Sequence, residues 1–190
     1  MGFDLNDLAW RLFSGKVAYF IDFFIVPPII AALLVWNSLV FGRDHAGQIL
    51  IAFAGGLLLW TFVEYFIHRL LFHHVWPLKQ MHDLHHENPE ALYGAPPFLG
   101  PVLIFALVDA PLEYLDQGWA AAATAGVMAG YFLYISHHYL DHAKPRFMAR
   151  VLARSRRRHM LHHHADKDTN FGVSTSLWDH VFRTEFKGRH

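Results

Sequence analysis

The sequence predicts an all-helical integral membrane protein, with four transmembrane helices and a histidine-rich helical cap on the cytoplasmic side. Its composition is the first observation behind this fold class. The chain of 190 residues is 54% hydrophobic and 16% aromatic but only 17% charged, unlike a typical soluble domain. The second observation is that apolar residues form long stretches, with clustered histidines between and after them. No linker of biased composition divides the chain, so we expect one domain over residues 1–190.

The first two expected transmembrane helices lie near the start of the chain. Residues 1–20 are expected to form an amphipathic helix on the membrane surface, because they lack the basic start and cleavage site of a secretory signal. Residues 23–41 carry no charge and have the length of a transmembrane helix, which Pro27 and Pro28 are expected to bend. After a short polar turn, the apolar residues 48–67 are expected to cross the membrane in the opposite direction.

The second expected pair of transmembrane helices is less apolar. Residues 97–115 contain Asp109, Pro111 and Glu113, whereas residues 118–136 are rich in Ala and Gly, which suits close packing in lipid. A buried hairpin of a soluble domain is the alternative for this pair. Four spans place both termini and all the histidine clusters on one side. That side holds nearly all Lys and Arg, so the positive-inside rule makes it cytoplasmic.

Ten histidines form four clusters whose spacing places imidazoles on common helix faces. They are His68, His73, His82, His85, His86, His138, His142, His159, His162 and His163. In each of two HxxHH boxes, the first histidine lies three and four residues from the others, one helical turn away. Neutral imidazole is the commonest protein ligand of borderline transition metals, and one ion takes only about four to six ligands. The pattern therefore predicts a metal site with two ions in the region of residues 60–184.

Some features of the clusters allow other interpretations. His68 and His73 are five residues apart, which on an ideal α-helix rotates one about 140° from the other, so this pair requires a helix end or two different ions. A solvated loop or an adventitious metal-binding tract is the alternative for all clusters, but such tracts are contiguous rather than phased. Nearby carboxylates are interpreted either as acceptors that fix imidazole tautomers or as ordinary caps and surface charges. These carboxylates are Glu64, Asp83, Glu87, Asp141 and Asp179.

Composition also excludes several classes of function. The chain has no cysteine, which excludes disulfides, thiolate zinc sites and cysteine-ligated iron–sulfur clusters. Its formal net charge is zero, so we expect no nucleic-acid partner.

The sequence resembles the fatty acid hydroxylase superfamily, which is related to the sterol desaturases, and within it most closely the fatty acid 2-hydroxylases. The sequence HRLLFH is similar to the family's HxxxxH box, and HDLHH with the later double proline Pro96–Pro97 is similar to its first HxxHH box. HHYLDH supplies HxxxH, and RHMLHHH with FGVSTSLWD supplies the closing box. The resemblance covers roughly residues 60–184.

This resemblance implies a membrane enzyme that hydroxylates a lipid acyl chain at C2 with O2, two electrons and a dinuclear metal centre. The ten clustered histidines would be its catalytic metal ligands. Iron is expected, because zinc does not change oxidation state, although zinc could replace it in a purified or crystallised form. No HPGG haem motif is present, so a separate electron-transfer protein, of cytochrome b5 or ferredoxin type, is expected. A bacterial cytoplasmic membrane is the expected location, or the endoplasmic reticulum if the source is eukaryotic.

Other functions stay open at this point. Sterol and carotenoid oxidases or hydroxylases share similar boxes, although the HxxxxH spacing disfavours the sterol branch, and HxxxH with FGVSTSLWD disfavours the carotenoid branch. A non-catalytic membrane metal carrier is the alternative from another class. Aromatic residues near the expected helix ends could line an acyl channel or form an interfacial belt. Arginines between residues 150 and 158 could contact an acidic electron donor or anionic lipid.

Overall fold

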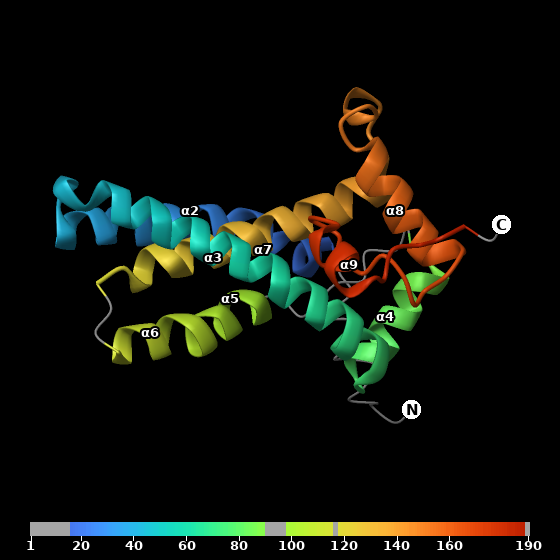
Figure 1. The fold of residues 1–190 in the computed structure, drawn as a ribbon, viewed down its shortest axis with the longest axis horizontal. Helices are drawn as coiled ribbons and strands as arrows, with labels where there is room; N and C mark the ends of the chain where they lie inside the picture. Colours follow the sequence, from blue (N-terminus) through green and yellow to red (C-terminus); the bar gives the residue numbers. More distant parts are fainter. Residues whose placement is uncertain (1–15, 90–97, 116–117, 189–190) are drawn as a thin grey trace. The chain divides into compact units, whose positions relative to one another are not determined.

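The computed structural model describes residues 16–89, 98–115 and 118–188, which form helices and turns without any strand (Figure 1). The chain divides into two compact units, one made of Met1–Leu58 and Ala91–Phe132, the other of Leu59–Glu90 and Leu133–His190. The helical class that the sequence predicts is therefore confirmed. Most of the expected amphipathic helix at residues 1–20 lies outside the described residues.

The first unit contains the two most apolar helices. In chain order its elements are α2 (Lys16–Phe41), η1 (Arg43–His45), α3 (Ala46–Phe66), α5 (Leu99–Ile104), η3 (Phe105–Asp109), α6 (Ala110–Tyr114) and α7 (Ala120–Ala143), of which α3 and α7 continue into the second unit. By length and composition, Lys16–Phe41 and Ala46–Phe72 are suited to cross a membrane. The first of these begins earlier than the expected 23–41, because the helix includes Lys16 and Asp22, whose charges lie outside the uncharged stretch on which the expectation was based.

The other two expected transmembrane helices take a different form. Residues 99–114 are helical but consist of the short α5, η3 and α6, and η3 is a π-helix. Helix α7 covers the expected fourth helix, and the side chains of its alanine-rich first half are buried. Among the described residues, only the two helices named above are long and apolar enough to span a membrane.

Small residues let α3 and α7 approach closely in the first unit, where Figure 1 shows them side by side. A Cβ atom added to Gly56 would lie 2.0 Å from the Ala123 carbonyl oxygen, and one added to Gly126 would lie 2.0 Å from the Phe53 carbonyl oxygen. Both glycines therefore permit backbone contact that any side chain would prevent. The alanine and glycine content of α7 serves this contact.

A buried carboxylate connects α2 to the other helices of this unit. Asp22 accepts hydrogen bonds from the Tyr131 hydroxyl at 2.6 Å and from the Phe98 backbone N–H at 3.1 Å. Asn37 near the other end of α2 donates to the Gly118 carbonyl at 2.8 Å. These polar contacts fix α2 against its neighbours.

The second unit holds all ten clustered histidines. Besides the ends of α3 and α7 it contains η2 (Ile67–Phe72), α4 (Leu78–Glu87), η4 (Arg146–Met148), α8 (Ala153–His164) and α9 (Leu177–Phe182). Aromatic rings pack α9 onto α3. Phe62 lies 4.8 Å from Trp178, and Tyr65 stacks on Phe182 at 5.3 Å between ring centroids. Phe62 and Tyr65 therefore help build the unit that carries the histidines.

Candidate metal centre

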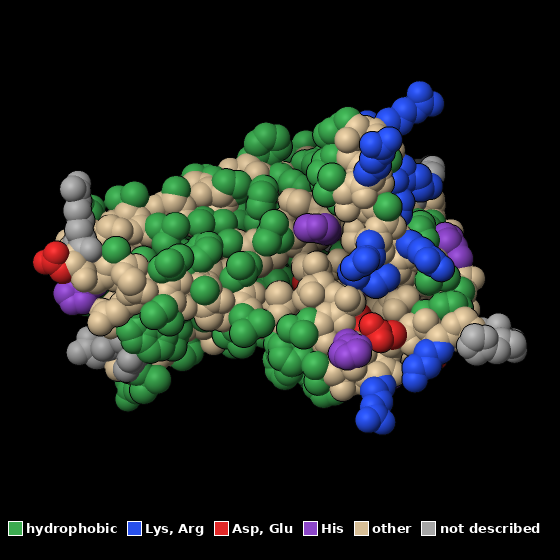
Figure 2. All heavy atoms as spheres, turned by 45° about the horizontal axis from the view of Figure 1, so that its top comes forward, with side chains coloured by type: hydrophobic (Ala, Val, Ile, Leu, Met, Phe, Trp, Pro, Cys, Tyr) green, Lys and Arg blue, Asp and Glu red, His purple; other side chains and the backbone are tan. Residues whose placement is uncertain are grey.

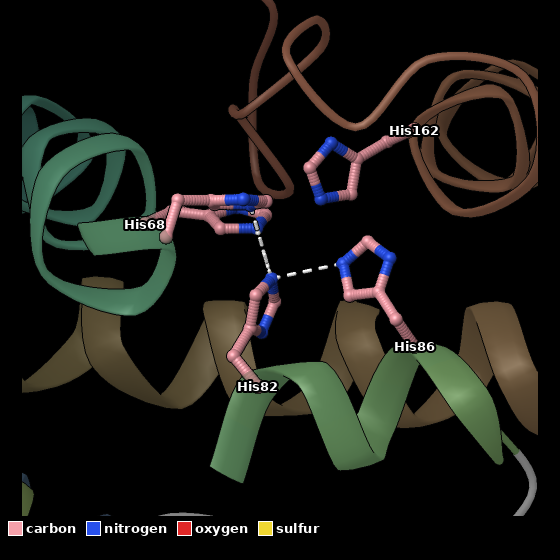
Figure 3. Close-up of side chains that lie close together, drawn as sticks. His68, His82, His86 and His162 are labelled. Atoms are coloured by element: carbon pink, nitrogen blue, oxygen red, sulfur yellow. Dashed lines mark hydrogen bonds between the residues drawn. The ribbon is translucent and has the colours of Figure 1, made fainter. Parts of the chain in front are cut away.

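Nine of the ten clustered histidines converge in two compact groups. The first histidine group consists of His68, His73, His82, His86 and His162. The second histidine group consists of His85, His138, His142 and His159. Within each group one ring nitrogen of every histidine lies within 4.8 Å of the others. Figure 3 shows four members of the first group, His68 from η2, His82 and His86 from α4 and His162 from α8, with their rings pointing toward one another.

The spacing in the first histidine group is the spacing that a bound ion imposes. The Nε2 atom of His82 lies 3.1 Å from that of His68, 3.2 Å from that of His73 and 3.0 Å from that of His86. A neutral imidazole Nε2 has one hydrogen or one lone pair, so it can satisfy only one of three such neighbours. Nitrogens bound at ~2.1 Å to one ion and at right angles to each other lie about 3.0 Å apart. The nitrogens therefore fit a common cation better than a hydrogen-bond network.

The second histidine group has the same short separations. His85 and His138 place their Nε2 atoms 2.9 Å apart, as do His142 and His159. His163 belongs to neither compact group, but its Nε2 lies 3.1 Å from that of His159. The His163 ring also stacks on His86 of the first histidine group, at 4.2 Å between centroids. The structure thus brings all ten predicted site residues together.

A π-helical turn explains how His68 and His73 reach the same group. Residues Ile67–Phe72 form the π-helix η2, whose hydrogen bonds join residues five apart, and His73 follows as its C-cap. Their rings stack at 5.3 Å between centroids. The expectation that this pair would need a helix end or two different ions assumed an ideal α-helix. The structure has the first of these alternatives, because the π-helix ends at Phe72 and His73, at that helix end, lies in the same group as His68.

Each HxxHH box divides its histidines between the two groups. On α4, His82 and His86 enter the first histidine group while His85 enters the second. On α8, His162 enters the first histidine group and His159 the second. On an α-helix, the side chains at positions i+3 and i+4 point in directions about 100° apart, because each residue turns the helix by about 100°. One helix can therefore contribute to two neighbouring sites, and the doubled HH serves this purpose.

Two imidazoles contact a backbone carbonyl, rather than a carboxylate, through Nδ1, the ring nitrogen that faces away from the histidine group. His68 donates from Nδ1 to the Phe171 carbonyl at 2.6 Å, and His162 donates from Nδ1 to the Thr169 carbonyl at 2.8 Å. Both rings therefore present an unprotonated Nε2 toward the group. The Nε2 atom of His162 is buried and has no hydrogen-bond partner among the described residues. Such an atom is suited to bind a cation.

Four of the five carboxylates named from the sequence have other partners in the described part of the chain. Glu64 and Asp179 accept backbone N–H groups of residues 171–174, and Asp141 accepts from the Ser155 hydroxyl. Asp83 pairs with Lys79 on α4. Within the described residues, no hydrogen bond joins one of the five carboxylates to a clustered imidazole, so the direct role in fixing tautomers is not observed. Sequence patterns give no signal for carbonyl acceptors, because every residue has one.

Burial keeps the histidines neutral. Burial, reinforced by neighbouring imidazoles, lowers the pKa of His73 and His86 from the usual 6.5 to about 4, and that of His85 to about 3. Burial also lowers the pKa of His162 to about 4. Neutral rings keep a lone pair for coordination at physiological pH.

An open pocket leads from solvent to the histidines. Its volume is about 530 Å³, and it borders His73, His86 and His163. Charged residues of α4 and of the segment after α8 line the rest of it. Water and protons can therefore reach the first histidine group and His163 by a polar route.

The chain matches known proteins over most of this region. The family model described as fatty acid hydroxylase matches residues 53–184. Dihydroceramide fatty acyl 2-hydroxylase FAH1 of Arabidopsis thaliana is 33% identical over 139 residues, which are 68% of this chain and 58% of that protein. Fatty acid 2-hydroxylase of Rattus norvegicus is 34% identical over 152 residues, or 70% of this chain and 38% of that protein. The chain thus spans less than two thirds of the length of these relatives.

A solved structure has the same fold. It is described as full length scs7p with only the hydroxylase domain visible, and the likeness has a TM-score of 0.79 at 24% sequence identity. The match covers 96% of this chain and 71% of that one.

Proposed function

The chain belongs to the fatty acid hydroxylase family, and from that premise we propose that it hydroxylates a lipid acyl chain at C2 with O2 and a dinuclear iron centre. The position follows the names of the relatives, which are 2-hydroxylases. The observation that carries the proposal is the convergence of imidazole nitrogens 2.9–3.2 Å apart in two groups.

We propose five ligands for each ion, with His163 as the fifth of the second histidine group. The two groups would then have matching sources. Each takes a pair from one long helix or its extension, an i and i+4 pair from one HxxHH box, and the i+3 histidine of the other box. His163 supplies the i+4 member that pairs with His159, as His86 does with His82.

The proposed reaction converts a C–H bond, O2, two electrons and two protons into a C–OH group and water. Iron held by the imidazoles would supply the change of oxidation state that O2 activation and cleavage of an unactivated C–H bond require. The chain itself contributes ten neutral imidazoles, which bind without adding negative charge. Its polar pocket beside His73 and His86 would admit the protons.

A membrane location fits a lipid substrate. Helices α2 and α3 carry large apolar side chains that are strongly exposed, among them Phe24 at 76%, Leu39 at 77% and Ile51 at 74%. Figure 2 shows hydrophobic side chains over much of one face of the first unit. We propose that the α5–α6 run and α7 add a second pair of membrane helices. The termini and the histidine cap would then be cytoplasmic, and the membrane would be the bacterial cytoplasmic membrane or the endoplasmic reticulum.

A separate electron-transfer protein of cytochrome b5 or ferredoxin type would supply the electrons, because imidazole side chains are not a source of reducing electrons.

We assign the basic surface around η4 and the start of α8 to anionic lipid. There Phe147 is 86% exposed and Val151 is 78% exposed, and Arg146, Arg150 and Arg154, which are close to them in sequence, are exposed as well. Apolar side chains among arginines suit the headgroup region of a bilayer.

Product analysis tests the function. Membranes containing the iron-loaded protein are incubated with reductant, an electron carrier, ¹⁸O₂ and lipid, and acyl chains are examined by mass spectrometry. We expect one ¹⁸O atom in a hydroxyl group at C2. If sterol or carotenoid were oxygenated while the acyl chains stayed unchanged, the proposed substrate would be wrong and the protein would belong to the sterol or carotenoid branch of the superfamily. Stoichiometric metal release without oxygen consumption would indicate a metal carrier.

A further inference from the structure

The loop of residues 170–174 carries a hydrogen-bond pattern that the proposed function leaves unexplained. Its four consecutive backbone N–H groups, from Phe171 to Ser174, all donate to carboxylates at 2.8 Å. Phe171 and Gly172 donate to the two oxygens of Asp179, and Val173 and Ser174 donate to one oxygen of Glu64. The Ser174 hydroxyl donates to the other oxygen of Glu64.

The two carboxylates are buried and come from different helices. Asp179 on α9 is 0% exposed, and Glu64 on α3 is 3% exposed. Burying carboxylates is costly unless hydrogen bonds compensate for lost water. Among the residues that the structure describes, the loop supplies every hydrogen bond to the Glu64 carboxylate and two of the three to Asp179, the third coming from the Thr184 hydroxyl. Gly172 completes the fit, because a Cβ there would lie 2.0 Å from the Thr175 carbonyl oxygen and 2.9 Å from an Asp179 oxygen. The loop is therefore held in one conformation.

The carbonyl groups at this loop point to histidines of the first histidine group. The Phe171 carbonyl accepts from His68, and the carbonyl of Thr169, which precedes the loop, accepts from His162. In the second histidine group, by contrast, the Nδ1 atoms of His85 and His159 are buried without a partner among the described residues. Among the described residues, backbone carbonyls therefore fix the tautomers of His68 and His162 in the first histidine group but not those of His85 and His159 in the second.

We propose that the 170–174 loop is a positioning clamp for the first histidine group, and that Glu64 and Asp179 are positioning residues that act through it. The clamp holds the proton of His68 and His162 on Nδ1 and so directs Nε2 to the ion. This inference rests on the dinuclear centre proposed above. Acceptors of this kind typically change metal affinity by about 10–100-fold.

Metal titration of substituted proteins tests the clamp. Fe²⁺ is titrated anaerobically into the metal-free full-length protein, in competition with a chelator, for wild type, Asp179→Asn and Glu64→Gln. In Asp179→Asn the amide nitrogen faces one of the two backbone N–H groups that the carboxylate accepts, so a donor meets a donor. In Glu64→Gln the amide oxygen can still accept from Val173 and Ser174 while the amide nitrogen faces the Ser174 hydroxyl, so this variant should lie at the lower end of the expected range. We expect about 10–100-fold weaker binding of one ion and unchanged binding of the other. Ser174→Ala removes one of three bonds to Glu64 and should give a smaller effect of the same kind.

Asp22→Asn is the matched control. Asp22 is also buried and also accepts a backbone N–H, but its partners Phe98 and Tyr131 belong to the first unit. This variant should lose stability and still bind two ions with wild-type affinity. Two ions bound normally by Asp179→Asn and Glu64→Gln would overturn the clamp, and so would equal weakening of both ions. A wild-type protein that binds fewer than two ions would instead contradict the dinuclear centre.

A second measurement does not depend on the folding of any variant at Glu64 or Asp179. Imidazole ¹⁵N spectra of the metal-free wild type, assigned with His68→Gln and His162→Gln, report which nitrogen carries the proton. We expect Nδ1 protonation for both histidines. Protonation of either ring on Nε2 would overturn the clamp.

Discussion

At the residue scale, the clustered histidines differ from ordinary surface histidines because they are more buried and because they contact other imidazole rings. His162 is 0% exposed and His68 is 2% exposed, although histidine is usually found partly in water. Short contacts between neutral rings offer little attraction without a cation. We therefore attribute the arrangement to metal binding rather than to packing.

Removal of a single imidazole should affect one ion. His85→Ala removes a member of the second histidine group, and His162→Ala removes a member of the first. We expect each variant to retain about one metal ion per chain and to lose at least about 100-fold in hydroxylation, because both ions are needed. Metal analysis and product assay check this. His180→Ala, at an exposed histidine outside both groups, should behave like wild type, and normal turnover by His85→Ala would remove His85 from the ligand set.

Acid should destabilise the metal-free protein. The folded-state pKa of His73, His86 and His162 is lowered to about 4, whereas an unfolded histidine titrates near 6.5. Between these values the unfolded chain binds protons that the folded chain does not, so stability falls as the pH falls from about 6.5 to about 4. Thermal unfolding in detergent should show a midpoint that decreases over this window. A midpoint that rises on acidification would contradict the burial of neutral rings.

The spacing of the histidines predicts which residues are metal ligands, but it does not predict which of the two groups each histidine joins. The sequence predicts ten clustered histidines and two ions, and the structure gathers all ten in one unit. It does not predict that His85 and His162 cross to the group opposite their box neighbours, because that depends on how helices α4 and α8 face each other. The acceptor at Phe171 is equally invisible, since it is a backbone atom.

At the element scale, local helix geometry decides which side chains meet. The π-helix η2 brings His68 and His73 into one group, and glycines bring α3 and α7 into backbone contact. The sequence indicated the glycine-rich character of α7 but not η2, because a π turn results from tertiary strain that no spacing rule records. The α5–α6 run was likewise expected as one helix of 97–115. A π-helical segment and Pro111 accompany its division into short elements.

Adjacent glycines of α3 provide a test of the helix contact. Gly56→Ala would place Cβ 2.0 Å from the Ala123 carbonyl oxygen, whereas nothing lies within 4 Å of a Cβ on Gly55. We expect Gly56→Ala to lower the free energy of unfolding by about 1–3 kcal/mol through forced separation of α3 and α7. Gly55→Ala should be neutral or stabilising by up to about 1 kcal/mol, because alanine favours helix. Denaturation in detergent compares the two, and equal stabilities would argue against the close contact.

At the scale of the whole molecule, the two units have different surfaces. The first presents apolar side chains on α2 and α3, and the second carries the histidines together with the basic surface around η4 and α8. Figure 2 shows Lys and Arg side chains gathered over the part of the molecule that contains α8. This distribution is compatible with the proposed contact between the basic surface and anionic lipid.

The absence of cysteine makes the basic surface testable at a single site. Phe147→Cys introduces the only thiol of the chain, which is labelled with an environment-sensitive fluorophore after reconstitution into nanodiscs. We expect a blue-shifted emission in discs that contain anionic lipid, and a smaller shift in zwitterionic discs or at high salt. A label at His180→Cys, on an exposed part of α9, should respond less. Shielding of Phe147→Cys only after addition of an acidic electron carrier would assign the surface to that protein instead.

The central claim is that the two histidine groups each hold one metal ion. Anomalous diffraction at the iron edge from crystals of the iron-loaded protein tests it most directly. The account predicts two anomalous peaks per chain, one surrounded by the Nε2 atoms of His68, His82 and His162, the other by those of His85, His138 and His159. A single peak, or peaks away from these imidazoles, would contradict it.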